Sequence, residues 1–195
     1  MALFLPDAVF PCYRDLSAAF LQERGIDLLL LDIDNTLAPY EQPDPDEENV
    51  RWLTSLAHAG IRVAFLSNNH GDRVTRFNRD LKLPVRSRAH KPLPFAARTV
   101  MRQMGGVKGR TAMMGDQIFT DVLCAKLCGV QAFLVPPIKD RTDLGTRIKR
   151  FFERDFLRRF YKKHPSAPDI RKGSPLTAQA LRRIAEQTEK NEKGN

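Results

Sequence analysis

Residues 28–37, LLLLDIDNTL, decide the fold and point to the chemistry of this chain. Four leucines followed by polar residues make a short apolar run, typical of a strand that is buried on both faces of a parallel sheet. The run ends at Asp32 and Asp34, and in an extended chain this spacing points both carboxylates the same way. Such a pair suits Mg²⁺, or a nucleophile with its acid–base partner. On this stretch alone, an ordinary Asp-Asn-Thr turn remains the alternative.

Polar residues follow two further apolar runs in the same manner. Residues 61–66 end at Ser67 and Asn68, and residues 111–114 are soon followed by Asp116. In open α/β sheets, the carboxyl ends of parallel strands form the crevice that binds ligands. Because three separate runs end this way, turn chemistry alone is a poor explanation, and the sequence predicts a polar site at one edge of the sheet.

The apolar runs alternate with segments of helical character about ten residues long. This alternation indicates β-α-β units and a parallel sheet with right-handed crossovers. We expect five strands, at residues 28–31, 61–66, 84–86, 111–114 and 130–135, and intervening helices at 46–59, 72–81, 94–104 and 119–128. The predicted fold class is therefore α/β, with a doubly wound, parallel, five-stranded sheet.

The chain divides into three expected parts. Residues 1–25 contain an arm with two prolines and a short amphipathic helix at 13–24, in which Gly25 is the stop signal. Residues 26–137 hold the alternating strands and helices. Residues 138–195 differ in composition and form a basic, helical C-terminal extension.

Composition limits the classes of function. The 195 residues carry a formal net charge of +9 and a pI of about 9.8, which favours an anionic partner such as a membrane surface, nucleic acid or a phosphorylated substrate. We expect a cytoplasmic protein, because no secretory signal or membrane-spanning run of roughly 18 apolar residues is evident. The three cysteines fit a reducing compartment, and Cys124 and Cys128 are expected to pack on one helix face.

Four motifs in chain order resemble those of the haloacid dehalogenase (HAD) superfamily of phosphohydrolases. Residues 32–36 match D-x-D-x-T, Ser67 matches the second motif, Lys91 the third, and residues 115–121, GDQIFTD, the fourth. Together they cover roughly residues 26–136. More narrowly, the sequence is similar to the capless class IIIA branch of the YqeG type, which is similar to phosphatidylglycerophosphate phosphatases.

The resemblance implies a role for each matched residue. Asp32 would be the nucleophile that forms an aspartyl-phosphate, and Asp34 would protonate the leaving oxygen and then activate water. Phosphoryl oxygens would be held by Ser67, Asn68 and Lys91. A Mg²⁺ ion would be held by Asp32, the main-chain carbonyl of Asp34, Asp116 and Asp121. The alternative for Asp121 is a cap of the following helix.

The spacing of the motifs bears on the substrate. The intervals from Asp34 to Ser67 and from Ser67 to Lys91 are filled by ordinary loops, helices and strands, which leaves no room for a lid domain. An open site suits a phosphate carried by something large, and we expect the headgroup of phosphatidylglycerophosphate. The alternatives are nucleic-acid ends, phosphoproteins, or a basic nucleic-acid- or ribosome-binding protein with a vestigial site.

Residues 146–163 interleave basic and apolar side chains, and Ile148, Phe152, Phe156 and Phe160 follow an i, i+4 pattern typical of an amphipathic helix. Either the apolar face docks on the domain and leaves a basic face in solvent, or the aromatic face lies on an anionic bilayer at the inner face of the membrane. Binding of nucleic acid is the third interpretation.

Overall fold

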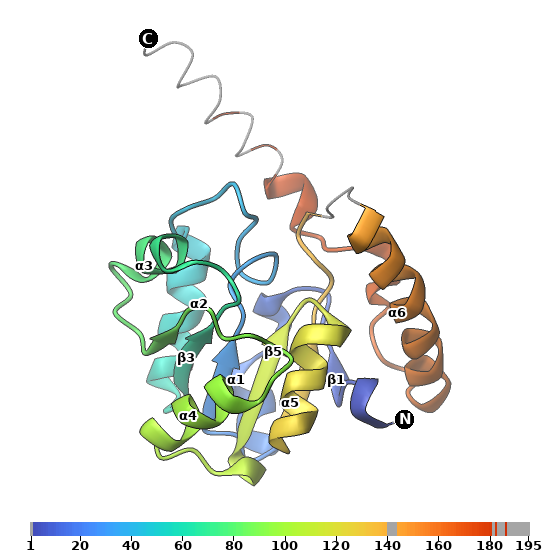
Figure 1. Ribbon diagram of the computed structural model, residues 1–195, viewed down its shortest axis with the longest axis horizontal. Coiled ribbons are helices and arrows are strands. Elements are labelled where there is room, and N and C mark those ends of the chain that lie inside the picture. Colours follow the sequence, from blue (N-terminus) through green and yellow to red (C-terminus); the bar gives the residue numbers. More distant parts are fainter. Residues whose placement is uncertain (1, 140–143, 181, 183–185, 187–195) are drawn as a thin grey trace.

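A parallel sheet of six strands forms the centre of the molecule, and helices cover both of its faces (Figure 1). The computed structural model describes residues 2–139, 144–180, 182 and 186. In sheet order the strands are β1 (Ala8–Val9), β6 (Gln131–Leu134), β5 (Thr111–Gly115), β2 (Leu28–Leu31), β3 (Arg62–Leu66) and β4 (Val85–Arg86). Every neighbouring pair is parallel, which confirms the predicted α/β class.

The sheet has one strand more than the five predicted, because the N-terminal arm pairs with β6 at the edge. In this pairing Val9 lies beside Leu134. A strand of two residues is too short to show a pattern of alternating side chains in the sequence. Pro6 and Pro11 flank the strand, and proline, which lacks a backbone donor, is tolerated at such an edge.

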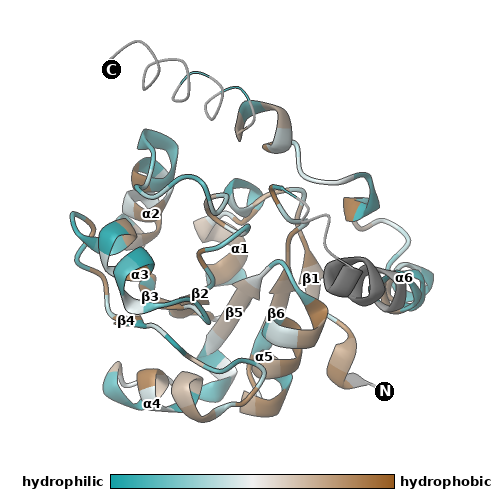
Figure 2. Ribbon diagram, turned by 45° about the horizontal axis from the view of Figure 1, so that its top comes forward, coloured by the Kyte–Doolittle hydropathy of each residue, from teal (hydrophilic) through white to brown (hydrophobic). Residues whose placement is uncertain are grey.

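The helices divide between the two faces of the sheet. They are α1 (Ala18–Glu23), α2 (Glu47–His58), α3 (Gly71–Asn78), α4 (Phe95–Gln103), α5 (Leu123–Cys128) and α6 (Leu144–Lys163). Side chains of α1, α2 and α3 join one buried cluster, and those of α4, α5 and α6 join the other. In Figure 2, hydrophobic residues are prominent on β1 and β5, whereas α3 is largely hydrophilic.

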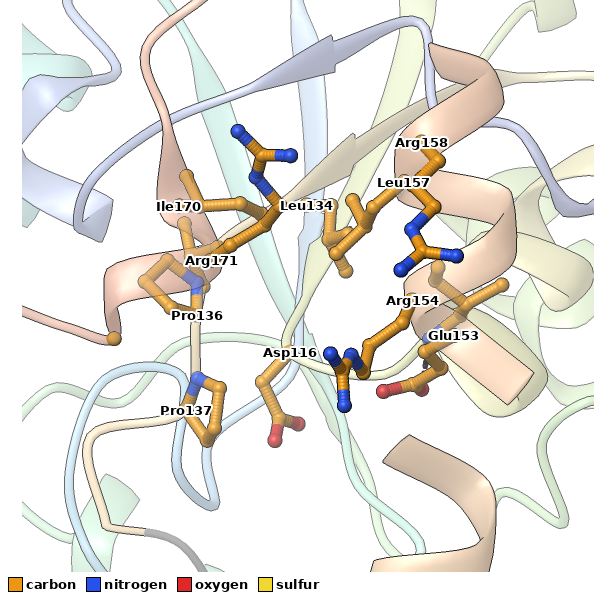
Figure 3. Close-up of a pocket in the computed structure, with 13 residues that line it drawn as sticks. Asp116, Leu134, Pro136, Pro137, Glu153, Arg154, Leu157, Arg158, Ile170 and Arg171 are labelled. Atoms are coloured by element: carbon orange, nitrogen blue, oxygen red, sulfur yellow. Dashed lines mark hydrogen bonds between the residues drawn. The ribbon is translucent and has the colours of Figure 1, made fainter. Parts of the chain in front are cut away.

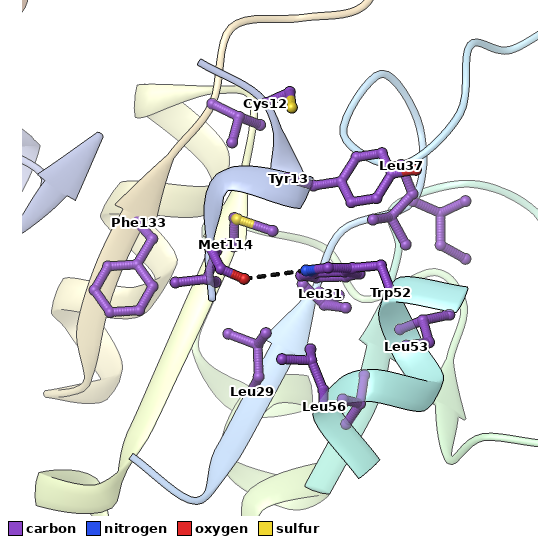
Figure 4. Close-up of a cluster of buried hydrophobic side chains, with 14 of the residues drawn as sticks. Cys12, Tyr13, Leu29, Leu31, Leu37, Trp52, Leu53, Leu56, Met114 and Phe133 are labelled. Carbon is purple, nitrogen blue, oxygen red and sulfur yellow. Dashed lines mark hydrogen bonds between the residues drawn. The ribbon is translucent and has the colours of Figure 1, made fainter. Parts of the chain in front are cut away.

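The four leucines of β2 contribute to both clusters, as the sequence predicts. Leu29 and Leu31 belong to the cluster that contains Trp52 of α2 (Figure 4), whereas Leu28 and Leu30 belong to the opposite cluster. All four leucines are completely buried. At roughly 1.5–3 kcal/mol for each buried leucine, this strand is a large part of the core.

Two local predictions need correction. The helix predicted at 13–24 is a 3-10 turn, Tyr13–Asp15, followed by the shorter helix α1, because Ser17 caps α1 by accepting a hydrogen bond from the Phe20 amide. In α2, the apolar pattern predicts an inner face made of Val50, Leu53, Leu56 and Ala57. Val50 and Ala57 are instead exposed, Val50 to 41%. Asn49 takes the inward position instead.

The buried amide of Asn49 has polar partners in this position. It donates hydrogen bonds to the hydroxyl of Tyr13, at 2.8 Å, and to the carbonyl of Leu37, at 3.0 Å. A buried amide is stable only when its polar atoms are paired in this way. A hydrophobic pattern alone therefore assigned the wrong residue to the inner face of α2.

The C-terminal helix α6 packs against the domain through the side chains described for it. Phe160 is buried, and the ring of Phe156 lies 5.0 Å from that of Phe4 and 5.9 Å from that of Phe119, measured between centroids. On the same helix, the carboxylate of Glu153 accepts a hydrogen bond from the Ile118 amide at 3.0 Å. The docking interpretation of this helix therefore holds for residues 153–163.

Other predictions about this segment fall outside the described residues. They include the side chains of Ile148 and Phe152 and, in the expected helical extension, residues 181, 183–185 and 187–195. None of the helices in the described ranges combines the length and the apolar character that a bilayer crossing requires. Cys124 and Cys128 are both buried and free, in agreement with their predicted packing.

Candidate active site

The predicted polar edge of the sheet exists at the carboxyl ends of β2, β3 and β5. The register aligns the ends of these strands, because Leu31 lies beside Phe65 on one side and Met114 on the other. The next residue, Asp32, continues this alignment by donating its amide hydrogen bond to the Met114 carbonyl at 3.0 Å. The residues that follow the three strands are thereby brought into one place.

Three carboxylates form a buried acidic cluster at this edge. Asp32, Asp116 and Asp121 each offer an oxygen, and these oxygens all lie within 4.8 Å of one another. The three residues are only 6%, 2% and 2% exposed, respectively. Asp32 follows β2, Asp116 follows β5, and Asp121 comes from a π-helical turn, Ile118–Val122, that leads into α5.

A close contact with glycine fixes the position of Asp121. A Cβ atom added to Gly115 would lie 2.2 Å from Cγ of Asp121, so only glycine fits at the end of β5. The Oδ2 atom of Asp121 accepts hydrogen bonds from the Gln117 amide and the Thr120 hydroxyl, each at 3.1 Å. Asp121 therefore contributes to the acidic cluster. The alternative that it caps the following helix is wrong, because the N-cap residue of α5 is Val122 and no side chain caps that helix.

Lys91 lies between two carboxylates of this cluster. Its Nζ atom is 2.6 Å from Oδ1 of Asp32 and 2.7 Å from Oδ1 of Asp121. The side chain of Asn68 orients the Lys91 backbone, since its Oδ1 accepts from the Lys91 amide at 2.7 Å and its Nδ2 donates to the Lys91 carbonyl at 2.9 Å. This pair of hydrogen bonds ties the loop after β3 to the loop that carries the lysine.

Burial and neighbouring charges set the protonation states of Asp32 and Lys91. Burial raises the pKa of Asp32 to about 7, and the carboxylates of Asp121 and Asp34 act in the same direction, against the lowering effect of Lys91. Burial alone would lower the pKa of the Lys91 ammonium, but Asp121 and Asp32 raise it above its ordinary value. Lys91 is therefore a fixed cation beside the carboxylate of Asp32.

The carboxylate of Asp34 lies apart from the acidic cluster and has its own partners. Its Oδ2 accepts hydrogen bonds from the Ser67 hydroxyl at 3.2 Å and from the side-chain amide of Asn69 at 3.3 Å. Its Oδ1 forms an ion pair with Nε of Arg73 at 3.2 Å. The sequence predicted that Asp34 would bind a metal through its main-chain carbonyl. The side-chain contacts do not test that prediction.

Several of these contacts were not identified from the sequence. Arg73, Asn69 and Thr36 were not assigned a role, although Thr36 donates a hydrogen bond to Oδ2 of Asp32 at 3.3 Å. For Arg73 there was a signal, because a cation in the first turn of a helix opposes the helix dipole at a cost of about 0.3–1 kcal/mol. Such a residue at the start of α3, just after the end of β3, suggests a partner at the polar edge.

The acidic cluster has the right chemistry for a divalent cation. Carboxylate oxygens are the ligands that hard cations such as Mg²⁺ prefer, and three of them converge here in a buried space. Three carboxylates held so close together repel one another, and a bound cation would offset that repulsion. The residues that would hold the ion are Asp32, Asp116 and Asp121.

Comparison with known proteins gives the family. A model of HAD-hydrolase-like proteins matches residues 88–148. The chain is also 32% identical, over 154 residues, to the probable phosphatase YqeG of Bacillus subtilis, an alignment that covers 79% of this chain and 90% of the relative. The chain belongs to the HAD superfamily of phosphatases. The resemblance that the four motifs suggested is therefore confirmed, and this HAD phosphatase carries all four of them at one edge of its sheet.

Two solved structures were also found to be similar. One is a cobalt-bound deoxy-D-mannose-octulosonate 8-phosphate phosphatase from Haemophilus influenzae, with 18% identity, a TM-score of 0.48, and coverage of 70% of this chain and 90% of the other. The other is a putative HAD hydrolase of subfamily III A from Legionella pneumophila, with 20% identity, a TM-score of 0.41, and coverage of 50% and 59%.

Proposed function

We propose that this HAD phosphatase hydrolyses a phosphomonoester by a Mg²⁺-dependent route through an aspartyl-phosphate on Asp32. The observation that carries the proposal is the position of the Asp32 carboxylate. It contacts Lys91 and Thr36 directly and lies in the buried cluster with Asp116 and Asp121. A nucleophilic carboxylate held by cationic and hydrogen-bonding groups is suited to attack on phosphorus.

Two carboxylates divide the chemistry between them. An oxygen of Asp32 attacks the phosphorus, while Asp34, in its acid form, gives a proton to the leaving oxygen of the alcohol. The Asp34 carboxylate then takes a proton from water, and that water attacks the phosphorus and releases inorganic phosphate from Asp32. Ser67 and Arg73, which contact Asp34, orient it for both steps.

The remaining residues bind and neutralise charge. Lys91, Ser67 and the backbone of Asn68 are proposed to hold the phosphoryl oxygens, while Asp116 and Asp121 hold the metal with Asp32. When bound, a divalent cation supplies positive charge that draws negative charge from the phosphoryl group as it is transferred. The side chain of Asn68 contributes indirectly, through its two hydrogen bonds to the Lys91 backbone.

The proposed substrate is phosphatidylglycerophosphate, which would be converted to phosphatidylglycerol. Three observations support this choice. The structure describes all of residues 34–91 and shows no inserted lid among them. The other two observations are the net charge of +9 and the basic face of α6. On that face Arg159, Lys162 and Lys163 are exposed. We propose a cytoplasmic enzyme that acts at the inner face of an anionic membrane.

A substrate screen with purified protein tests this proposal. Phosphate release would be measured from phosphatidylglycerophosphate in vesicles, a 5′-phosphorylated oligonucleotide, a phosphopeptide and p-nitrophenyl phosphate, each with Mg²⁺ or with EDTA. We expect Mg²⁺-dependent turnover, fastest with the lipid. Fastest turnover of the oligonucleotide or the phosphopeptide would overturn the choice of substrate, and turnover that persists in EDTA would overturn the metal dependence.

A further inference from the structure

A pocket of about 480 Å³ opens directly beside the acidic cluster (Figure 3). Asp116 forms part of its wall, so the pocket adjoins the acidic cluster. The rest of the wall comes from Ile118, from the end of β6 and the residues that follow it, from α6, and from a 3-10 turn, Ile170–Lys172, with the next residue, Gly173. Most of the lining therefore belongs to the C-terminal extension, outside the four motifs.

The pocket is lined by three arginines. Arg154 and Arg158 are four residues apart on α6 and therefore project from the same side of the helix. Figure 3 shows the guanidinium of Arg154 directed from α6 toward Asp116, whereas the side chain of Arg158 runs along the helix at the edge of the pocket. Arg171 approaches from the 3-10 turn, where Asp169 accepts hydrogen bonds from its guanidinium at 2.7 and 2.9 Å.

Two carboxylates also border the pocket, but both have other roles. Asp116 belongs to the acidic cluster, and Glu153 is 4% exposed and accepts the Ile118 hydrogen bond. Arg158 has a surface neighbour in Asp155 at 3.6 Å, on the exposed side of the helix. The accessible charge in the pocket is therefore mainly that of guanidinium groups, which bind phosphate oxygens through paired hydrogen bonds.

One part of the pocket wall is apolar. Leu134, Pro136, Leu157 and Ile170 contribute hydrocarbon surface between the arginines and the end of β6. A pocket that combines cations with an apolar wall fits a ligand that has both an anionic group and a hydrocarbon portion. A small sugar phosphate would leave the apolar wall uncovered.

We propose that this pocket binds the part of the substrate that lies beyond the scissile phosphate, namely a phosphodiester and the adjoining acyl-glycerol. The phosphodiester is bound by Arg154 and Arg158, and the acyl-glycerol lies along Leu157 and Ile170. This inference rests on the proposed phosphatase function and assigns substrate selection to the C-terminal extension. The motif residues supply the chemistry, and the arginines select a phosphomonoester that carries a second phosphate.

Binding of the product tests the inference separately from turnover. The probe is dihexanoyl phosphatidylglycerol, used below its micelle-forming concentration and titrated into the full chain by calorimetry, with Mg²⁺ present. We expect the double variant Arg154→Gln/Arg158→Gln to bind at least tenfold more weakly than the wild type, a change of about 1.4 kcal/mol. The control is Arg159→Gln, which removes one positive charge from the same helix at a residue that does not line this pocket.

The chemical parts of the ligand can be separated with two further probes. Glycerophosphoglycerol has the phosphodiester without acyl chains, and we expect it to bind more weakly than the dihexanoyl lipid but with the same dependence on the arginines. Glycerol 3-phosphate lacks the diester, and its affinity should change less in the double variant. Equal binding of the acylated and deacylated probes would overturn the assignment of the apolar wall.

The outcomes distinguish this inference from the proposed function. No binding of the dihexanoyl lipid to the wild type, or an equal loss in the double variant and in Arg159→Gln, would overturn the inference even if phosphatidylglycerophosphate is hydrolysed. Conversely, arginine-dependent binding without hydrolysis of that lipid would support the pocket and contradict the proposed substrate. Circular dichroism of each variant confirms that a loss of binding is not a loss of folding.

Discussion

Arg73 donates a hydrogen bond from Nε to Oδ1 of Asp34 at 3.2 Å, and its two terminal nitrogens donate to the carbonyls of Gln42 and Pro39. One guanidinium thus links the proposed acid–base residue to the proline-rich loop that follows β2. Both partners of the ion pair are largely buried. Arginine fits this place because its planar fork provides several donors in fixed directions, which a lysine does not.

Arg73 should therefore act as a positioning residue for Asp34. We expect Arg73→Gln to lower kcat for p-nitrophenyl phosphate by about 10- to 100-fold, with a smaller change in KM, and Arg73→Lys to recover only part of this loss. The control is Arg76→Gln on the same helix, whose partner is the more exposed Asp44. A melting temperature lowered without any change in kcat would show that the arginine is only structural.

The nucleophile can be tested by changing one atom of its side chain. Asp32→Asn keeps the shape of the residue but removes the nucleophilic carboxylate, so activity should fall by at least about a thousandfold at saturating Mg²⁺. Trapping of labelled phosphate on the acid-quenched wild type, and not on the variant, would identify the intermediate. Turnover like that of the wild type in Asp32→Asn would contradict the mechanism.

The two other acidic residues should differ in their effect on the metal. Asp116→Ala is expected to raise the Mg²⁺ concentration needed for half-maximal activity more than Asp121→Ala does. Asp121 also holds Lys91 and the Gln117 amide, so its loss should lower the melting temperature as well. A Mg²⁺ titration with the reverse order would show that Asp121 is the stronger ligand.

Gly115 should not tolerate even one added methyl group. In Gly115→Ala, the new Cβ would meet Asp121, and overpacking of this kind typically costs about 1–3 kcal/mol. We expect Gly115→Ala to have a lower melting temperature and to need a higher Mg²⁺ concentration for half-maximal activity. Gly109→Ala is the matched control, because a Cβ there has open space around it. Similar melting temperatures for the two variants would contradict the close packing at the end of β5.

Membrane attraction should come from charge rather than from inserted aromatic rings, because Phe156 and Phe160 pack against the domain. We expect co-sedimentation with anionic but not neutral vesicles, weakened by salt and by Lys162→Gln/Lys163→Gln. Each cation near an anionic surface contributes roughly 1 kcal/mol at low salt. Equal partitioning to both kinds of vesicle would reject this peripheral attachment.

Sequence reasoning was most successful where a local pattern carries the structural information. The strand β2, the polar edge and the stop signal at Gly25 follow from runs of a few residues. The structure agrees with them, since α1 ends at Glu23 and Gly25 has a left-handed φ of 68°. The strand β1 and the inward position of Asn49 depend instead on partners far along the chain. For these elements the local pattern is either too short or gives the wrong residue, because tertiary contacts decide the outcome.

The same limit applies to the site. The motifs identified the residues that converge at the strand ends, but the link from Arg73 to Asp34 depends on how α3 lies against the sheet. For α6, the amphipathic pattern is the same whether its partner is a protein core or a bilayer, and only the contacts of Phe156 and Phe160 show which face is covered. The pocket beside Asp116 left no signal in the motifs at all.

The hydrogen bond from the Ile118 amide to Glu153 has a consequence for how the enzyme is made. Translation completes the four motifs when Asp121 has been added, yet the acceptor that anchors the loop between Asp116 and Asp121 is added later, and Arg171 later still. A nascent chain, or a fragment that stops at Pro137, would carry every residue of the proposed chemistry without this anchor. The anchor of this loop therefore forms only after Glu153 has left the ribosome.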